Sequence, residues 1–554
     1  MRKPHKILIS NNASIRDAMK LLNKQLEKLL IVIDKKNFFY GVLNDGDLRR
    51  AILKGNSINK KIKSIVNRNP LTISDQVSEN EAYNKINAKI LVLPVLNLKN
   101  EVKGYYSFKD KNQLYSSKSR NVLVFGMGYV GLTLGATISN LGFNVLGYDK
   151  NKSVISNLKK GIPPFFENGL KKYIDPKINR NLTFIDSLKK NIASTYICAV
   201  GTPVNSKTKK VNIDSIVEVS NQISKILKKD DLIIMRSTMP IGTTRNIVIP
   251  ILESKTNLKA GRDFHIVSAP ERTAEGKAMK ELRENPQIIG SINQTSFQKA
   301  SDLFSTFTKS IISLPTLESA EFSKLLDNTF RDNIFAFINQ MIPITEKLNI
   351  DLCEVVDAVN HGYPRNNVPK PSPGVGGPCL IKDPYLLKYN FDQLKIKNIL
   401  LDGARKVNEN ITQHLYSKLN NFLKKIGKNF NNSKIFIIGL AFKGNPETSD
   451  LRDSTSIDLI KKFKKTRNLY VYDPVIDKKT LKNLGYNYLN LERGFSKADL
   501  VIFLNNHKSY QELNIFKLAK KMNKPGAIID TWKVLNPIEI KSIKNILYGG
   551  LGFD

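Results

Sequence analysis

Residues 121–131 read NVLVFGMGYVG, and this stretch decides the fold of the central part of the chain. A short apolar strand passes into a glycine-rich turn that opens an apolar helix. Such glycines permit a tight turn, let a pyrophosphate approach the backbone N–H groups, and let helix and strand pack closely. The next apolar strand, 144–148, is followed by an acid that can accept ribose hydroxyls and repel a 2′-phosphate. We therefore expect NAD, rather than NADP, on Gly126, Gly128, Tyr129, Val130, Gly131 and Asp149.

The chain has 554 residues, which at about 100–200 residues per domain corresponds to three or four domains. Hydrophobic residues make up 41% and charged residues 25%, so a globular chain is expected. After residue 120 strands alternate with helices, which is typical of an α/β fold. The first residues lack a long apolar stretch, so we expect no signal peptide, and we expect no membrane span because no apolar run reaches roughly 18 residues. Three cysteines are too few for a disulfide scaffold, so we expect the cytoplasm.

Positive charge exceeds negative charge in this sequence. Lys and Arg number 87 and Asp and Glu 49, which gives a net charge of +38. Such an excess can indicate a nucleic acid or an anionic surface as partner. Here it is mostly Lys, spread along the chain in pairs such as Lys60 and Lys61, with no Arg-rich stripe. We interpret it as a solvated surface and expect no specific nucleic-acid or membrane partner.

Residues 1–115 contain two similar halves of about 55 residues, which indicates one pseudo-symmetric module. The first half ends in NDGDLRR at 44–50 and the second in GYYSFKD at 104–110. This pattern resembles a pair of CBS domains, a regulatory α+β module. The resemblance implies AMP or ATP on Asp47, Ser107 and Asp110, with Asn44 in place of the usual hydroxyl residue before Asp47. The alternative is a module that only packs or dimerises.

Polar residues follow several strands at the edge where ligands bind in parallel sheets. The segment CAVGTP at 198–203 places Thr202 there, and MRSTMP at 235–240 places Thr238 there. The loop SAPERTAEG at 268–276 adds Glu271 and Glu275. We expect the two threonines at the ligand-binding edge of the sheet and the two acids together in their loop.

The stretch 317–348 predicts a long helix with a polar stripe. Glu321, Lys324, Asn328 and Arg331 recur with helical spacing, so at about 100° per residue they share one face. The flanking residues, such as Phe330, are apolar and leave little wet face. The stripe is therefore expected to line a site.

The sharpest motif is GVGGPCLIKD at 374–383. Its glycines, among them Gly376, let the backbone approach a ligand closely. Lys382 and Asp383 follow Cys379 by about one helical turn. A cysteine near a cation can hold thiolate character and act as a nucleophile, and we expect this role for Cys379. The other two cysteines are expected to be buried and structural.

From about residue 120 to its end, the chain resembles the UDP-glucose/GDP-mannose dehydrogenase family, the NAD-dependent four-electron oxidases of nucleotide sugars. Further matching segments are KIFIIGLAFKG at 434–444, DLRDS at 450–454 and YDP at 472–474. The resemblance implies two Rossmann-like domains joined by a helical central domain that forms a homodimer. With the CBS-type tandem module in front, we expect four parts: 1–115 regulatory, 120–315 NAD-binding, 316–415 helical with the cysteine loop, and 430–554 nucleotide-sugar-binding.

The resemblance also implies a reaction. The C6 hydroxyl of the sugar loses hydride to NAD, Cys379 adds to the aldehyde, a second NAD oxidises the thiohemiacetal to a thioester, and water releases the uronate, a surface-polysaccharide precursor. The implied catalytic residues are Cys379, Lys324, Asn328, Asp383, Glu275, Thr238 and Glu271. Implied further contacts are Thr202, Thr238 and Lys382 to NAD, and Lys324, Asn328, Arg365, Gly376 and Lys443 to the sugar nucleotide. No metal is implied.

Two positions depart from the family pattern. The spacing around Arg365, which would reach a neighbouring subunit's substrate, is unusual. Where the family has Asp-Thr-Arg, this chain has Asp-Thr at 530–531 followed by Trp532 and Lys533. Either Lys533 supplies the missing charge or the phosphate contact is weaker. The loop 270–276 resembles the branch that oxidises UDP-N-acetylhexosamines. We expect UDP-N-acetylmannosamine or UDP-N-acetylglucosamine, with UDP-glucose and then GDP-mannose as alternatives.

Two other classes stay open. A two-electron hydroxyacid dehydrogenase of the 6-phosphogluconate type shares a Rossmann domain and a helical Lys/Asn pair, but it needs no cysteine. A nucleotide-sensing protein would use the CBS pair and leave the remainder inert, against which the complete set of Lys324, Asn328, Cys379 and Asp383 argues. The nucleotide-sugar dehydrogenase and the nucleotide sensor combine in a third hypothesis, an enzyme gated by an adenine nucleotide near Asp47 and Asp110.

Overall fold

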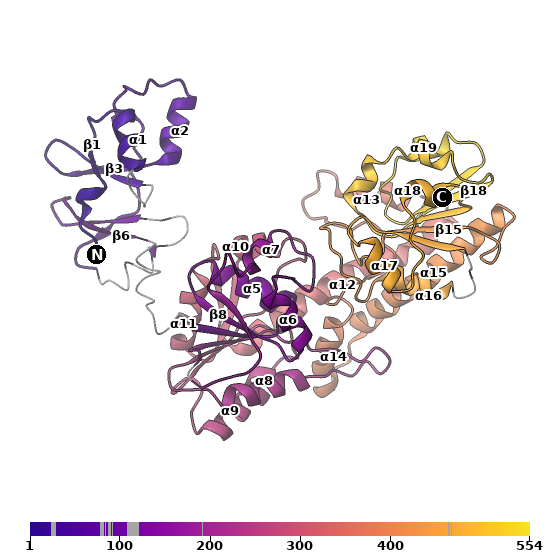
Figure 1. Ribbon diagram of the computed structural model, residues 1–554, viewed down its shortest axis with the longest axis horizontal. Helices are drawn as coiled ribbons and strands as arrows, with labels where there is room; N and C mark the ends of the chain where they lie inside the picture. The colour runs from indigo at the N-terminus through magenta and orange to yellow at the C-terminus, as the bar shows by residue number, and fades with distance from the viewer. Residues whose placement is uncertain are drawn as a thin grey trace. The chain divides into compact units, whose positions relative to one another are not determined.

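The computed structural model describes residues 1–23, 29–77, 82, 85–86, 90, 92–107, 121–190, 192–463, 466 and 468–554. The chain divides into two compact units (Figure 1). One holds residues 1–121 with the segments 283–286 and 301–311, and the other holds 122–282, 287–300 and 312–554. Residues 108–120, and with them Asp110, lie outside the described residues.

The N-terminal unit contains two small sheets with the same connections. One has the order β1 (Leu8–Ser10), β2 (Leu29–Ile33), β3 (Phe39–Asn44), and the other β4 (Ile73–Ser74), β5 (Val92–Leu96), β6 (Val102–Ser107). In each sheet the first pair is parallel and the second antiparallel, which confirms the internal repeat. Its helices are η1 (Pro4–Lys6), α1 (Ile15–Asn23), α2 (Asp45–Leu53) and η2 (Ile62–Ser64).

A doubly wound sheet of eight strands follows. Its order is β14-β13-β12-β11-β10-β7-β8-β9, in which six neighbours from β9 to β12 follow the 3-2-1-4-5-6 order of dinucleotide-binding folds. The strands are β7 (Asn121–Phe125), β8 (Asn144–Tyr148), β9 (Leu182–Ile185), β10 (Thr195–Cys198), β11 (Leu232–Met235), β12 (His265–Ser268), β13 (Gln287–Ser291) and β14 (Ile311–Leu314). The helices are α5 (Tyr129–Ser139), α6 (Lys152–Lys159), α7 (Leu170–Ile174), α8 (Asp214–Ser224), η3 (Thr244–Val248), α9 (Ile249–Thr256), α10 (Ala278–Glu284) and α11 (Gln294–Phe304).

Two glycines explain why the chain can turn so tightly after β7. Gly126 has φ +91°, and a Cβ there would lie 2.7 Å from the carbonyl oxygen of Ala199. At Gly131 a Cβ would lie 1.9 Å from the oxygen of Gly126, so only glycine lets α5 pack against the strand. The strand–turn–helix unit predicted from residues 121–131 is confirmed.

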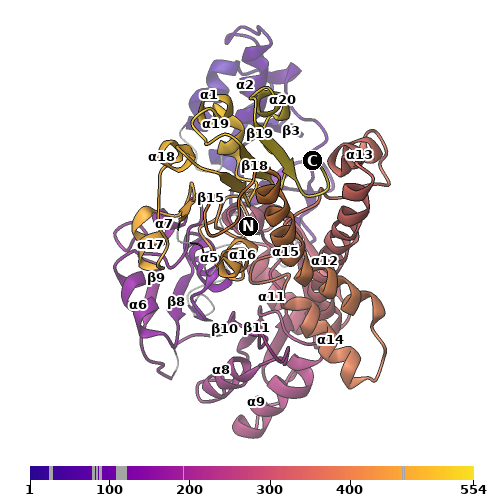
Figure 2. The same cartoon turned by 90° about the vertical axis from the view of Figure 1, so that its right-hand side faces the viewer.

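Four helices form the centre of the larger unit: α12 (Leu317–Lys347), α13 (Leu352–Asn360), α14 (Asp383–Gln393) and α15 (Ile399–Lys425). Figure 2 shows the long helices α12 and α15 side by side, and a buried ion pair of 2.7 Å joins Asp332 to Arg405 between them. The helix predicted at 317–348 is confirmed, and its observed end differs from the predicted end by one residue. No helix in the described ranges is long and apolar enough to span a membrane.

The C-terminal domain is a second doubly wound sheet, with the order β16-β15-β17-β18-β19 and every pair parallel. Its core is shared with α15, because Leu419 and Phe422 pack with Ile437 and Ile502 of the sheet. The strands are β15 (Ile435–Ile438), β16 (Leu469–Tyr472), β17 (Leu500–Phe503), β18 (Gly526–Asp530) and β19 (Ile546–Gly550). The helices are α16 (Thr455–Lys462), α17 (Lys478–Asn483), α18 (Leu491–Phe495), η4 (Lys508–Glu512), α19 (Ile515–Ala519) and α20 (Pro537–Lys541). The α/β fold class and its helical centre are confirmed.

Candidate active site

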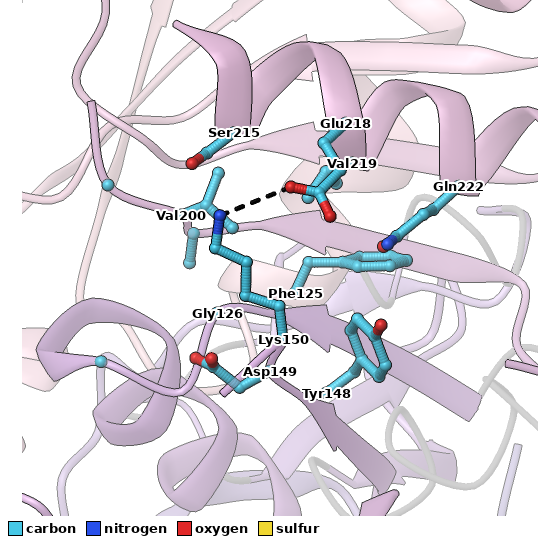
Figure 3. Close-up of a pocket in the computed structure, with 13 residues that line it drawn as sticks. Phe125, Gly126, Tyr148, Asp149, Lys150, Val200, Ser215, Glu218, Val219 and Gln222 are labelled. Carbon is cyan, nitrogen blue, oxygen red and sulfur yellow. Dashed lines mark hydrogen bonds and ion pairs between the residues drawn. The ribbon is translucent and has the colours of Figure 1, made fainter. Parts of the chain in front are cut away.

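The glycine-rich turn after β7 opens onto a cavity of about 210 Å³. Asp149 is half-buried in its wall, where its carboxylate accepts hydrogen bonds from the backbone N–H groups of Met127 (2.8 Å) and Asn151 (2.9 Å). Figure 3 shows Phe125 and Tyr148 in the wall and Lys150 reaching to Glu218 at 3.5 Å. An aromatic wall with the Asp149 carboxylate beside it suits the adenine and ribose of a dinucleotide.

The start of α5 suits the pyrophosphate. Gly128 is the residue before the helix, and an added Cβ would meet nothing within 4 Å, so the approach to the backbone is open. Val130 is half-buried in the first turn. The Tyr129 hydroxyl donates to the Glu167 carboxylate at 2.6 Å, a contact that no sequence motif indicated.

The carboxyl ends of β10 and β11 bring Thr202 and Thr238 together, as predicted. The Thr202 hydroxyl donates to the backbone carbonyl of Thr238. Thr202 also lines a larger cavity of about 890 Å³ together with Lys382, Arg405 and Arg452. That cavity joins the NAD domain, the helical centre and the C-terminal domain.

The cysteine loop is clamped against the C-terminal domain. The N–H of Gly377 donates to the carbonyl of Asp453 at 3.1 Å, and a Cβ on Gly376 would lie 3.0 Å from the same oxygen. A Cβ on Gly377 would lie 2.6 Å from the Phe442 ring. The glycines of this loop therefore serve close packing, and Cys379 beyond them stays solvent-accessible.

Two residues of the polar stripe on α12 lie near Cys379: Asn328 contacts Asp383, and the charge of Lys324 acts on the thiol. Lys324 and Asn328 are 7% and 0% exposed, and the Asn328 amide donates to the Asp383 carboxylate. Lys382 forms an ion pair of 2.5 Å with Asp383. The structure thus gathers residues from α12 and from the start of α14 around one thiol.

The thiol of Cys379 is crowded by protein atoms, although the residue as a whole is exposed. Its pKa is raised, chiefly because the surrounding protein removes water from the thiolate and next because Asp383 is negative. Lys324 and Lys382 act in the opposite direction but do not reverse the shift. This shift favours the thiol over the expected thiolate, so the proton has to leave as the sulfur reacts. Cys198 and Cys353 are buried, as predicted.

The loop after β12 carries two glutamates with different environments. Burial opposes ionisation of Glu271, but Arg236 at 2.5 Å, nearby Lys324 and the N–H of Arg272 lower its pKa overall. Burial, and then the charge of Asp450, raise the pKa of Glu275 to about 7. Glu271 is therefore held as an anion, whereas Glu275 can exchange a proton near neutral pH.

The C-terminal domain reaches this loop directly. Lys443 donates to the backbone carbonyl of Glu275 at 2.8 Å, and Arg452 lies 3.4 Å from the Glu275 carboxylate. Burial lowers the pKa of Lys443. Lys443 was predicted as a substrate contact, and Arg452, which the DLRDS motif contains, was not singled out.

Two sequence-based expectations need correction or completion. Glu321 shares the stripe with Lys324, but its carboxylate accepts from the N–H groups of Gly242 (2.6 Å) and Thr244 (2.9 Å), so it anchors the loop after β11. Lys533 forms ion pairs with Asp351 (2.5 Å) and Glu354 (3.2 Å), so its charge is already paired.

Arg365 lies exposed on the loop after α13, with its guanidinium 4.7 Å from the Tyr363 ring centre, and it does not line the described cavity. In the N-terminal unit, Asn44 and Asp47 form a reciprocal helix cap, and Ser107 ends β6 in the interior. Within the described ranges, no cluster of three or more His, Cys, Asp or Glu side chains could hold a metal ion.

Other residues that shape the site had no sequence signal. Arg236 is 1% exposed and donates to the carbonyl of Ala269 and to Gln287, both at 2.7 Å, so it fixes the glutamate loop. Arg405 donates to the carbonyl of Leu380, next to Cys379, at 3.1 Å. Each arginine is far in the sequence from the residues that it contacts, and the periodicity of a sequence does not predict such long-range contacts.

Fold and site together define a dehydrogenase with a dinucleotide-binding turn, an accessible cysteine and a second doubly wound domain. The chain belongs to the UDP-glucose/GDP-mannose dehydrogenase family: its NAD binding domain matches residues 120–308, its central domain 318–410 and its UDP binding domain 436–537. A CBS domain matches residues 1–54, the first of the two repeated halves. The protein is an NAD-dependent nucleotide-sugar dehydrogenase.

Several relatives are similar over most of their length. The UDP-N-acetyl-D-mannosamine dehydrogenase of Campylobacter jejuni is 32% identical over 72% of this chain and 98% of its own. The solved UDP-D-ManNAc dehydrogenase of Pyrococcus horikoshii is 27% identical, with a TM-score of 0.69 over 78% of this chain and 99% of its own. The UDP-N-acetyl-mannosamine dehydrogenase of Staphylococcus aureus is also 27% identical, with a TM-score of 0.67 over 78% and 98%.

Proposed function

We propose that this protein oxidises the C6 hydroxyl of UDP-N-acetylmannosamine to the uronate, with two NAD reduced for each sugar. The observation that carries the proposal is the accessible Cys379 beside Lys324, Lys382 and Asp383, because an oxidation that stops at the aldehyde needs no nucleophilic thiol. The names of the relatives favour the mannosamine sugar. UDP-N-acetylglucosamine, UDP-glucose and GDP-mannose follow as alternatives.

The first oxidation needs a base at the sugar hydroxyl. Glu275 is the candidate, because a carboxyl with a pKa of about 7 can both take and release a proton at neutral pH. NAD, when bound, accepts a hydride in each of the two oxidation steps. Lys324 supplies positive charge to the oxygen as the C–H bond breaks, and Thr238 at the end of β11 orients a water beside it.

The second oxidation proceeds through Cys379. Glu275 first releases its proton to solvent, and the sulfur then adds to the aldehyde carbon while the thiol proton passes to Glu275, which gives a thiohemiacetal whose oxygen Lys324 and Asn328 stabilise. Loss of hydride from that carbon leaves a thioester. Water oriented by Asp383 then adds and gives up two protons, one to the leaving thiolate and one to solvent, and the uronate is released. The sequence consumes one water and removes four electrons from the sugar.

A count of NADH per sugar tests this proposal. Wild type should form two NADH per UDP-N-acetylmannosamine, and Cys379→Ser should stall after partial oxidation, because an oxygen ester is a poor substitute for the thioester. Lys324→Ala should lower kcat about 10²–10³-fold, the usual cost of losing an oxyanion-stabilising group. The buried Cys353→Ser variant is the matched control and should keep the ratio of two.

Other results would point elsewhere. One NADH per substrate, or full activity of Cys379→Ala, would support a two-electron hydroxyacid dehydrogenase. A panel of UDP- and GDP-sugars compared by kcat/KM decides the substrate. We place the reaction in the cytoplasm, where Cys379 stays reduced, and in the supply of surface-polysaccharide precursors.

We also propose a homodimer through α12. An exposed apolar stripe runs along this helix, with side chains 40–61% accessible at Phe322, Leu326, Phe330, Phe337 and Ile344. An exposed apolar stripe of this kind marks a protein–protein contact, and we assign it to a second copy of the chain. Light scattering at micromolar concentration should give twice the chain mass, and a monomer would contradict the dimer.

For the N-terminal module we propose gating by AMP or ATP near Asp47, Ser107 and Asp110. The support is the CBS match over residues 1–54 together with the ordered helix cap, in which Asp47 accepts from the N–H of Asn44 at 3.0 Å. Addition of AMP or ATP to the full chain should change kcat or KM, and Asp47→Ala should weaken that response. Unchanged kinetics at millimolar nucleotide would rule the gating out.

A further inference from the structure

The loop between α6 and α7 carries a buried carboxylate that the proposed reaction does not use. Glu167 is 6% exposed. One of its oxygens, Oε2, accepts from the Tyr129 hydroxyl at 2.6 Å and from the N–H of Gly276 at 2.6 Å. Its other oxygen, Oε1, has no hydrogen-bond partner among the described residues. A carboxylate so placed connects two segments that are far apart in the sequence.

The first of these segments is the dinucleotide-binding turn. Tyr129 is the first residue of α5, directly after Gly128. Its ring lies 5.1 Å from that of Phe165, which belongs to the same loop as Glu167. Its hydroxyl also lies 3.0 Å from the carbonyl of Ala274. Tyr129 is therefore fixed from two sides at the helix end where a pyrophosphate would bind.

The second segment is the loop that carries Glu275. Gly276 has φ +87°, and a Cβ there would lie 2.5 Å from the carbonyl oxygen of Glu447, so the backbone has no room to move toward the C-terminal domain. On the other side, Asn168 donates to the carbonyl of Gly276 at 3.4 Å. The residue after Glu275 is thus held between the Glu167 loop and the C-terminal domain.

We propose that Glu167 is a positioning residue that ties the NAD-binding turn to the backbone of Glu275 and holds this base in place for proton transfer. It acts through Tyr129 and Gly276 and touches neither substrate nor cofactor. The inference rests on the proposed role of Glu275 as the base.

Charge supports the geometry. The groups that act on Glu275 are Asp450, Arg452 and Lys443 from the C-terminal domain and Glu167 from the NAD domain, and Glu275 in turn acts on Cys379. Burial raises the pKa of Glu275 most, Asp450 and Glu167 raise it further, and Arg452 and Lys443 lower it. Loss of the Glu167 charge alone therefore lowers that pKa.

Two substitutions separate the hydrogen bonds from the charge. Glu167→Gln can keep both bonds, because its amide oxygen can take the place of Oε2, while it loses the charge. The low-pH limb of kcat/KM should then move about 0.5 unit to lower pH, since that limb reports the base of the free enzyme. Glu167→Ala loses both bonds, and its kcat should fall about 10–100-fold, the equivalent of one or two charge-assisted hydrogen bonds.

A matched control and a conservative variant define the contrary results. Glu253→Gln removes a charge of the same domain, where Glu253 pairs with Lys259 at 3.0 Å, and should leave the pH profile as in wild type. Tyr129→Phe removes one of the two bonds and should lower kcat less than Glu167→Ala does. If Glu167→Gln leaves the pH limb in place and Glu167→Ala turns over normally, the inference is wrong.

A thermal cycle tests the coupling without any turnover. At pH 8 the ionised Glu275 repels Glu167, whereas at pH 5.5, below the pKa of about 7, it is protonated. The change in Tm caused by Glu167→Gln should therefore be more positive at pH 8 than at pH 5.5. This difference should vanish when Glu275→Gln is also present. An equal difference with and without Glu275→Gln overturns the inference even if no sugar is oxidised. A wild type that oxidises no sugar but shows the coupling would instead contradict the proposed function.

Discussion

The two doubly wound domains begin with the same turn and use it differently. Gly126 and Gly439 both have φ +91°, and each donates its N–H at 2.8 Å to the last residue of the neighbouring strand, Tyr148 or Tyr472. In both domains an aspartate follows that strand and accepts from the N–H of the residue after the glycine. The backbone geometry of a nucleotide-binding turn is therefore present twice.

The two aspartates differ in how many N–H groups they accept and in how far they are exposed. Asp149 accepts two N–H groups and stays half-buried in the wall of a cavity, whereas Asp473 is 3% exposed. Four N–H groups donate to the Asp473 carboxylate: those of Leu440, Ala441, Val475 and Ile476. In the first domain α5 starts at Tyr129, close after its glycine, but in the second α16 starts only at Thr455. The turn alone therefore does not make a binding site.

Substituting each aspartate by alanine tests this difference most directly. Asp473→Ala leaves four buried donors without their acceptor, each worth about 1–3 kcal/mol, of which entering water restores a part. We expect the free energy of unfolding to fall by roughly 4 kcal/mol, with loss of the C-terminal domain's cooperative transition. Urea titration followed by circular dichroism measures this.

Asp149→Ala is the matched variant in the first domain. It removes two N–H contacts at a wetter position, so stability should fall by only about 1 kcal/mol. The KM for NAD should rise about tenfold, the equivalent of one charge-assisted hydrogen bond. Equal losses of stability in the two variants would show that Asp149 is structural as well.

The first turn could be predicted from sequence because its signal is local. A strand, Gly126, Gly128 and Gly131 and then Asp149 lie within one βαβ unit, so spacing alone fixes the geometry. The same holds for the spacing of Lys324 and Asn328 on α12. The meeting of these residues with Cys379 followed from family resemblance and not from any period in the sequence.

What escaped prediction depends on long-range contacts. The carboxylate of Glu321 turns to Gly242 and Thr244, although its helical position matches that of Lys324. The exposed face of α12, with Phe330 at 61%, looked like an interior because apolar residues do not reveal whether their partner is the same chain. Glu167 gave no signal, since its contacts to Tyr129 and Gly276 span 38 and 109 positions.

The two domains also differ in how strongly they affect the pKa of Glu275. Asp450 of the C-terminal domain raises the pKa of Glu275 more than Glu167 does, and it also holds Arg452 at 2.5 Å. In Asp450→Asn the repulsion disappears and Arg452 is free to approach Glu275, and both changes lower that pKa. The low-pH limb of kcat/KM should move down by about one unit.

A control on α16 checks that this shift is local. Asp458→Asn removes the same charge from the same domain, where Asp458 pairs with Lys461 at 2.8 Å, and should leave the profile in place. Rates from pH 5.5 to 9 at saturating NAD give the comparison. A larger shift from Glu167→Gln than from Asp450→Asn would reverse the proposed order of the two domains.

The smallest expected effect concerns the residue after each aspartate, which is Lys150 in the first domain and Pro474 in the second. Lys150 stands at the ribose end of the cavity, where a 2′-phosphate would meet Asp149, but Glu218 holds it at 3.5 Å (Figure 3). Both side chains are largely exposed, at 67% and 47%, so the pair is worth about 0.2–1 kcal/mol. Glu218→Gln should therefore raise kcat/KM for NADP only about 2–5-fold, with NAD almost unaffected because Asp149 still accepts the ribose hydroxyls. The gain should disappear in Glu218→Gln with Lys150→Ala, since the freed cation is its cause. If it persists there, Glu218 itself repels the phosphate, and the acidic character of the first turn extends beyond Asp149 to the helix that faces it.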